Sequence, residues 1–460
     1  MLTVLLVASL CAGSPRSAQA DEARLRVGIV SDTHITDEAS ALPFQRALEY
    51  FRDRGVDAVL HGGDISDWGL VSGWRYAAEA WERVFPGDKA PGGREVVKLF
   101  TTGNHDFEGC KYWDQSEEMH ANGFSESELL VRNGIDRQWK KIFGLEFKPV
   151  TCQRVKGYDF LSCHWNDRKA IVDWMRKNGQ RVAGPRPFFF FQHGHPQGTI
   201  PGDNWGDGGA AKEAFADYPN AVVFGSHTHL SLTDGHEIWQ GEFTAVGTAS
   251  LSWSELPFGY ENARPFDPNS DYIEQMPLLP CRFKQENKQG LLMSVYDDRI
   301  VFERVDFGGE CELDAPWVVP LPACRGRSPW SHENQVKSMP VPQFLPGSVV
   351  KTRTVVGRDR KGNMSVQMVL DFPAAADGKT RAYDYAIAAR TDDGRETVLA
   401  KVLSPTYNYG VSRECAGVQA VVSVRKLPVD VPYRLIVRPR NSFGVCGNPI
   451  VSEPRKGLPL

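Results

Sequence analysis

Arg26-Val27-Gly28-Ile29-Val30-Ser31-Asp32-Thr33-His34 joins a run of apolar residues to a polar end. Residues 26–30 predict a strand buried on both faces, because the run is short, β-branched and apolar. Asp32 and His34 follow at once and alternate, so both side chains point to one face of an extended segment. Such a strand indicates an α/β domain with functional groups at the carboxyl ends of its strands.

The same alternation of strands and helices continues downstream. Further strands are predicted over residues 58–60, 96–100, 158–163, 188–192 and 221–224. Amphipathic helices are predicted over residues 43–54, 76–84 and 168–177. This alternation predicts a layered α/β domain whose sheet strands are buried on both faces.

Four more segments place metal-binding residue types at the end of a predicted strand. They are Gly63-Asp64, Gly103-Asn104-His105-Asp106, His193-Gly194-His195 and Gly225-Ser226-His227-Thr228-His229. Each alone is a weak signal, since a Gly-Asp is usually a turn and a single buried histidine usually belongs to the core. Together with the first segment they contain six of the 11 histidines of the chain. Because the carboxyl ends of such strands line the ligand crevice, we expect the five segments to converge on one metal centre.

A two-metal centre needs this mixture of residues. A bridging carboxylate can hold two cations about 3.5–4 Å apart, where they deprotonate a water that attacks phosphorus. Asp64 is the candidate bridge, and the glycines near Asp64, Asn104 and His227 permit close approach of the backbone. Nitrogen and oxygen ligands without thiolate suit Zn, Mn or Fe better than Mg or Ca.

With these residues in place, the chain resembles the calcineurin-like metallophosphoesterase family over roughly residues 24–309. The resemblance implies a four-layer α/β/β/α sandwich, a dinuclear metal centre and the hydrolysis of phosphomonoesters or phosphodiesters. One divalent or transition metal ion would be bound by Asp32, His34, Asp64 and His229. The other would be bound by Asp64, Asn104, His193 and His227.

The resemblance also implies roles for the residues beside the metals. His105 would contact the phosphoryl group or protonate the leaving oxygen, with Asp106 orienting its ring, while Asn104 and His105 would stabilise the added charge. His195 is the alternative to His193, which we favour because it lies directly at the strand end. Asp67 stands where the purple acid phosphatase branch has a metal-bound tyrosine, so a tyrosinate–iron centre is not expected.

Three long loops, residues 108–124, 196–209 and 254–279, are the predicted places for substrate contacts. The candidates in them are Asp203, Trp205, Asp207, Tyr260, Asn262 and Arg264. The remaining histidines are predicted to be structural, with His164 the first exception to consider because it ends a strand. They are His61, His120, His164, His236 and His332.

The carboxy-terminal part has a different pattern. Residues 328–347 contain four prolines and predict a linker between residues 21–327 and residues 348–460. Beyond it only strands are predicted, which indicates an all-β sandwich domain. Those strands cover residues 349–356, 365–370, 382–389, 396–403, 420–424 and 433–437. Leu427-Pro428 through Tyr433, Val437, Asn441 and Gly444 resemble a fibronectin type III domain.

Charge is divided unevenly between the two parts. The 460 residues carry 53 Lys+Arg and 57 Asp+Glu, a formal net charge of −4, so no specific nucleic-acid binding is expected. From Val341 on, 18 basic residues face 10 acidic ones, a charge of +8, which leaves −12 for the rest. A basic sandwich could contact an anionic envelope or a glycan, although a solvated spacer explains the same charge.

The amino terminus predicts export. The apolar run of residues 2–13 is shorter than the roughly 20 residues of a membrane-spanning helix. It leads to Ala18-Gln19-Ala20, which fits signal-peptide cleavage after residue 20 and a periplasmic or secreted protein. Export permits disulfides among the eight remaining cysteines, for which Cys311 with Cys324 is one plausible pair, but buried free thiols are the default interpretation and the sequence does not give the pairing.

The sequence therefore predicts a secreted dinuclear-metal phosphoesterase that acts by attack of a metal-bridging hydroxide on a phosphate ester. One alternative is a phosphodiesterase specific for lipid head groups, nucleotides or envelope polymers. The other is an envelope- or glycan-binding protein whose metal domain is inactive.

Overall fold

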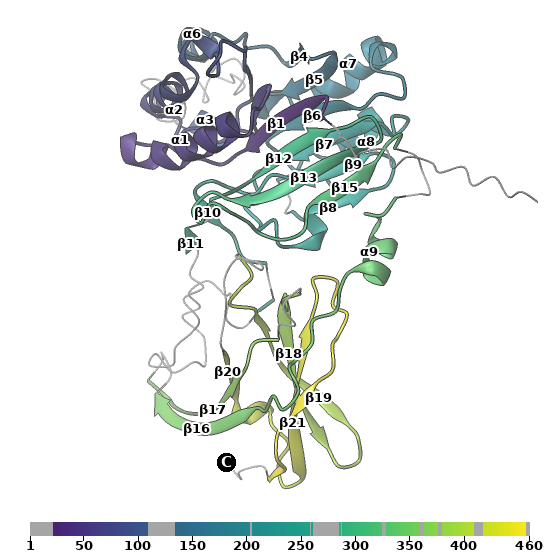
Figure 1. Cartoon of the computed structure of the whole chain (residues 1–460). Coiled ribbons are helices and arrows are strands. Elements are labelled where there is room, and N and C mark those ends of the chain that lie inside the picture. Colours follow the sequence, from purple (N-terminus) through teal and green to yellow (C-terminus); the bar gives the residue numbers. More distant parts are fainter. Residues whose placement is uncertain are drawn as a thin grey trace, which may run out of the picture.

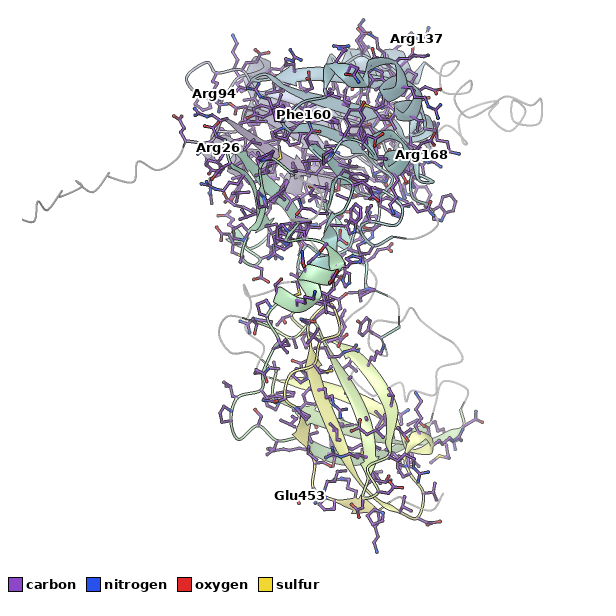
Figure 2. All side chains as sticks on the ribbon, turned by 90° about the vertical axis from the view of Figure 1, so that its right-hand side faces the viewer. Arg26, Arg94, Arg137, Phe160, Arg168 and Glu453 are labelled. Carbon is purple, nitrogen blue, oxygen red and sulfur yellow. The ribbon has the colours of Figure 1, made fainter. Side chains whose placement is uncertain are left out.

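The computed structural model describes residues 22–108, 134–202, 205–257, 259–260, 285–286, 288–323, 328–358, 362–375, 380–408 and 417–456. Figure 1 shows an α/β domain above an all-β domain, with helix α9 (His332–Ser338) between them. Figure 2 places Glu453 at the end of the all-β domain that is distant from the α/β domain. The expected signal peptide, residues 1–20, lies outside the described residues.

Two mixed sheets form the centre of the α/β domain. In the first sheet β1, β2 and β3 are parallel, and β12 pairs antiparallel with β1. Its order is β14 (Cys311–Glu312), β13 (Arg299–Asp306), β12 (Gln289–Val295), β1 (Leu25–Val30), β2 (Ala58–His61) and β3 (Val97–Phe100), with β15 (Trp317–Pro320) paired to β13.

In the second sheet β5, β6, β7 and β9 are parallel, whereas β4 and β8 are antiparallel to their neighbours. Its order is β4 (Val150–Val155), β5 (Tyr158–Cys163), β6 (Phe188–Gln192), β7 (Ala221–Gly225), β9 (Thr244–Gly247) and β8 (Ile238–Gln240). The short strands β10 (Trp253–Ser254) and β11 (Gln285–Glu286) form a separate pair.

Alternating side chains of the strands divide the domain into four layers. Val59 of β2 packs under the helices on one face, while the next residue, Leu60, packs between the two sheets. On the far side, Phe190 of β6 packs against Phe215 of the helix layer. The helices are α1 (Glu38–Asp53), α2 (Val71–Val84), α3 (His105–Glu108) and α6 (Ile135–Phe143) on the first sheet, and α7 (Ala170–Asn178) and α8 (Ala210–Phe215) on the second. The expected α/β/β/α architecture is confirmed.

The carboxy-terminal domain is an antiparallel sandwich, as predicted. Its core holds Leu370 from one sheet and Ile387 and Leu435 from the other. One sheet has the order β16 (Lys351–Arg358), β17 (Met364–Phe372) and β20 (Val418–Ser423). The other has the order β19 (Glu396–Leu403), β18 (Asp384–Thr391), β21 (Pro432–Arg440) and β22 (Ile450–Val451), with β23 (Arg455–Lys456) paired to β21.

Local capping moves some boundaries away from the predicted ones. Helix α1 begins at Glu38 rather than at residue 43, because the Asp37 side chain accepts a hydrogen bond from Ser40 N at 2.8 Å. The expected linker contains α9, which begins after Ser331, whose hydroxyl accepts from Asn334 N at 3.3 Å.

Specific hydrogen bonds join the two domains. The Tyr383 hydroxyl donates to Asp234 Oδ2 at 2.7 Å, and Gln289 Nε2 donates to the Asn408 carbonyl at 2.7 Å. A cavity of about 310 Å³ lies at this interface, and Arg304, Trp317, Gln335 and Tyr383 contribute to its lining. None of the predicted metal ligands lines it.

The described cysteines are free thiols: Cys152, Cys163, Cys311 and Cys446. Cys324, the partner suggested for Cys311, lies outside the described residues.

Candidate metal centre

The predicted polar segments meet at one edge of the α/β domain. Each follows the carboxyl end of a parallel strand, namely β1, β2 and β3 of the first sheet and β6 and β7 of the second. Backbone hydrogen bonds join neighbouring segments, from Asp32 N to the Gly63 carbonyl at 2.9 Å and from Ser226 N to the His193 carbonyl at 2.9 Å. The convergence of segments almost 200 residues apart in the chain therefore follows from the sheet topology.

Asp32, His34, Asp64 and His229 form the first cluster, in which their ligand atoms lie within 4.8 Å of one another. His229 Nε2 lies 3.0 Å from Asp32 Oδ1, and His34 Nε2 lies 3.7 Å from Asp64 Oδ2. All four residues are buried. This is the set expected for one metal ion.

Asp64 also belongs to a second cluster, with His193 and His227. His193 Nε2 lies 3.1 Å from Asp64 Oδ2, 3.2 Å from His227 Nδ1 and 3.1 Å from Asn104 Oδ1. The structure thus brings together all seven predicted ligands, and Asp64 stands between the two groups as a bridge would.

The donor atoms fit two cations. Asp32 Oδ1 is buried and accepts no hydrogen bond within the described residues, although His229 Nε2 is 3.0 Å away. His34 Nε2 and His229 Nε2 face each other at 3.3 Å, an arrangement expected of two nitrogens directed at a common ion. Both clusters offer only nitrogen and oxygen, as Zn, Mn or Fe sites do.

Electrostatics also favour positive charge here. Burial would raise the pKa of Asp64, but the imidazoles of His193 and His34 lower it to about 2. Burial would lower the pKa of His193, but Asp64 and Asp32 raise it to about 9. The buried carboxylates are therefore stabilised by a positive charge beside them, which can be a protonated histidine or a bound cation. A bound metal ion would take the place of the histidine proton.

The ligand positions carry backbone strain. Asp32, His34, Asp64, His227 and His229 all have positive φ angles, between 47° and 74°. Residues other than glycine rarely adopt this region, and such strain gathers at functional sites. The neighbouring Gly103 is also required, because a Cβ there would lie 2.1 Å from Asp64 Oδ1. The backbone is thus shaped around the carboxylate, as the glycine-rich motifs predict.

His105 lies beside the centre, and its ring is held by Asp67 rather than by the expected Asp106. Its Nδ1 lies 2.7 Å from Asp67 Oδ1, and its backbone N–H donates to Asp64 Oδ1 at 2.8 Å. Asp106, predicted to orient the ring, instead accepts from the Trp74 indole at 2.8 Å and from backbone N–H groups. Those groups belong to Ile65, Ser66 and Gly103. Asp106 thus fixes the loops that carry the ligands.

Asp67 also contacts a predicted ligand, because its Oδ1 lies 3.3 Å from His34 Nδ1. Asp67, His34 and His105 form a third group that could hold a cation. From the sequence, Asp67 is notable only because it replaces the metal-bound tyrosine of the purple acid phosphatase branch. Its position three residues after Asp64 was the one available signal.

The other described histidines belong to neither of the two clusters. His195 belongs to none of the candidate groups within the described ranges, so the geometry favours His193. Burial lowers the pKa of His61 and of His164 to about 3, and His164 stacks on Phe147 at 3.9 Å. His236 and His332 lie together, with ring centroids 5.5 Å apart, and His120 is outside the described residues.

Of the six predicted substrate contacts, three lie within the described residues. Asp207 is buried and accepts from Gly209 N and Ala211 N at 2.8 Å, which makes it a structural residue at the start of α8. The Tyr260 hydroxyl donates to Asp384 of the sandwich at 2.7 Å. Trp205 is 65% exposed. Asp203, Asn262 and Arg264 are outside the described residues.

The comparisons with known proteins agree with this geometry. Residues 25–231 match the family model of the calcineurin-like phosphoesterases, and this range contains all seven predicted ligands. These residues form a calcineurin-like phosphoesterase domain. The family and the paired clusters support a metal-dependent phosphoric ester hydrolase with two divalent ions.

Several solved structures are similar to the calcineurin-like phosphoesterase domain. A dimetal phosphatase from Danio rerio has 12% identity and a TM-score of 0.34, and the match covers 65% of this chain and 100% of that one. The purple acid phosphatase PPD1 from yellow lupin has 12% identity and a TM-score of 0.39, with 64% and 53% covered. No curated protein matches the sequence. Within the described residues no helix is long and apolar enough to span a membrane.

Proposed function

We propose that this protein hydrolyses a phosphomonoester or a phosphodiester at the two clusters that share Asp64. The observation that carries the proposal is this sharing, with His105 directly beside it. Two divalent cations bound there would activate water and neutralise the charge that develops on the phosphoryl oxygens. Asp32, His34 and His229 would complete one ion's ligands.

Asn104, His193 and His227 would complete the ligands of the other ion. The Asn104 amide lies beside His193 Nε2, so its oxygen faces the same point as the imidazole. All these groups are held by strand ends, which fixes the position of the phosphoryl group without a costly rearrangement.

His105 would protonate the leaving alcohol oxygen. Because its Nδ1 is engaged by Asp67, the proton to be transferred sits on Nε2. The Asp67 carboxylate would hold the ring in this tautomer and stabilise its charged form, so Asp67 acts as a positioning residue.

The test is hydrolysis of p-nitrophenyl phosphate and bis-p-nitrophenyl phosphate with Mn or Zn. We expect His105→Ala and Asp64→Asn each to lower kcat by about 100-fold or more, and chelation to abolish activity. Full activity in either variant, or in the presence of chelator, would refute the mechanism. The ratio of the two wild-type rates decides between a monoesterase and a diesterase. The alternative that a higher diesterase rate would favour is an enzyme specific for lipid head groups, nucleotides or envelope polymers.

The rival class is an envelope- or glycan-binding protein with an inactive metal domain. Such a protein has no need of His105 beside a complete set of ligands that includes Asn104. Bound metal near two ions per chain favours the hydrolase, whereas none after reconstitution favours the binder.

We further propose that the sandwich is fibronectin type III-like and that the protein is exported. The strand orders β16-β17-β20 and β19-β18-β21-β22, in facing sheets, support the first proposal. The features of residues 1–20 support the second, and export would let the basic sandwich contact an anionic envelope or a glycan. Export predicts a mature protein that begins at Asp21 in the periplasm or medium, and an intact amino terminus in the cytosol would contradict it.

A further inference from the structure

Three tryptophans lie beside histidines at or next to the metal centre. The Trp253 ring lies 4.2 Å from the His34 ring and 4.6 Å from the His229 ring, centroid to centroid. The Trp165 ring lies 5.5 Å from His193 and 5.4 Å from His227. Indole rings therefore flank both clusters.

The third tryptophan, Trp68, lies beside His105, with ring centroids 6.4 Å apart and planes at 70°. Trp165 is buried and Trp253 is half-buried, but Trp68 is 53% exposed. Trp68 therefore presents indole surface to solvent next to the group that we place at the leaving oxygen.

The backbone of Trp68 is strained as well. Its φ angle is +57°, in a region that bulky side chains rarely adopt. The turn is nevertheless fixed, because Leu70 N donates to the Asp67 carbonyl at 3.3 Å and the Ser66 hydroxyl donates to the Leu70 carbonyl at 2.7 Å. Neither the strain nor the exposed apolar surface stabilises the fold.

We propose that Trp68 is a stacking platform for the alcohol part of the ester, and that the preferred substrates carry a planar aromatic ring next to the ester oxygen. This inference rests on the proposed function. An alcohol oxygen that receives the proton of His105 brings its substituent close to that ring, and the Trp68 ring lies beside it, with centroids 6.4 Å apart. A cationic substituent is disfavoured there, since the charged His105 ring and two metal ions would repel it.

The experiment compares benzyl phosphate with cyclohexylmethyl phosphate in the full chain with Mn. Both alcohols have similar size and similar leaving ability, so the planar ring is the main difference. If diesters are preferred, the methyl diesters of the same alcohols replace them. We expect wild-type kcat/KM to favour the benzyl ester by about 2- to 10-fold, the range of an aromatic pair.

Variants then assign the preference to Trp68. We expect Trp68→Leu to bring the ratio of the two kcat/KM values close to one, and Trp68→Phe to retain part of the preference. Leu70→Ala removes an exposed apolar side chain two residues further on and is expected to keep the wild-type ratio.

Three outcomes would overturn the inference alone: equal rates for both esters in the wild type, an unchanged ratio in Trp68→Leu, or faster hydrolysis of phosphocholine than of the benzyl ester. A folded, metal-loaded wild type that hydrolyses none of these esters would instead refute the proposed function.

Discussion

Asp67 links a predicted metal ligand to the predicted proton donor, because one carboxylate oxygen faces both His34 and His105. Asp67→Asn removes the negative charge that holds both rings. We expect kcat to fall by about 10- to 100-fold, the usual effect of losing a carboxylate behind such groups. Steady-state assays measure this, with Asp53→Asn on the exposed end of α1 as the matched control. Wild-type kcat in Asp67→Asn would contradict the assigned role.

Glu237 is buried, and neither of its carboxyl oxygens has a hydrogen-bond partner within the described ranges. Burial, with a smaller effect of Asp234, raises the pKa of Glu237 well above its ordinary value. The stability from its protonated form is fully present below about pH 4.3 and is lost as the pH rises toward the raised pKa.

Glu237→Gln is neutral at every pH, so it should be more stable than the wild type at pH 8, and the advantage should shrink at pH 5. The expected difference is about 1.4 kcal/mol for each unit by which the folded-state pKa is raised. Chemical denaturation at the two pH values measures it. A variant less stable than the wild type at pH 8 would show that the folded protein stabilises the ionised Glu237 carboxylate.

The sequence points to the residues of the two clusters because each lies within four residues of the carboxyl end of a strand. Asp32 and His34, for example, come just after β1, although both have positive φ angles, so the segment is not extended as the alternation predicts. Asp67 and Trp68 lie in a turn with no periodicity, and what they contact depends on another loop. Their contacts with His105 could therefore be found only from the structure.

At the scale of elements, Gly73 lets α2 approach the loop after β1. A Cβ at Gly73 would lie 2.2 Å from the Ile35 carbonyl oxygen. In a helix, alanine is normally favoured over glycine by about 1 kcal/mol, but overpacking against backbone costs about 1–3 kcal/mol. The clash therefore outweighs the helix preference, and the substitution is expected to destabilise the fold.

We therefore expect Gly73→Ala to lower the free energy of unfolding by up to about 2 kcal/mol, as measured by urea denaturation. Gly184→Ala is the control, because a Cβ there would meet nothing within 4 Å. Equal stability of the two variants would mean that α2 can move away from the loop.

Several strands with a local pattern are predicted closely, and β5, β6 and β19 have the expected bounds, whereas α1 and α2 each begin five residues before the predicted start. Strands β12 and β13 are not predicted, although β12 pairs with β1 from Leu25 to Ile29. The hydrogen bonds that define such a pair join residues far apart in the chain, so no local pattern predicts their register.

At the scale of the molecule, the sandwich holds the segment that follows His229. Gly235 N donates to the Ser442 hydroxyl at 3.2 Å, and the Tyr383 hydroxyl donates to Asp234. Tyr383→Phe leaves a buried carboxylate without one donor, so we expect a loss of about 1–3 kcal/mol in the free energy of unfolding. Calorimetry tests this, with Tyr76→Phe on α2 as the control. An unchanged melting temperature in Tyr383→Phe would mean that the interface does not stabilise the molecule.

The most direct test of the two-metal centre is anomalous diffraction from crystals grown with Mn. We predict two peaks, one among Asp32, His34 and His229 and the other among Asn104, His193 and His227, both within bonding distance of Asp64. A single peak, or a peak held by His34, Asp67 and His105 in place of these two, would contradict the account.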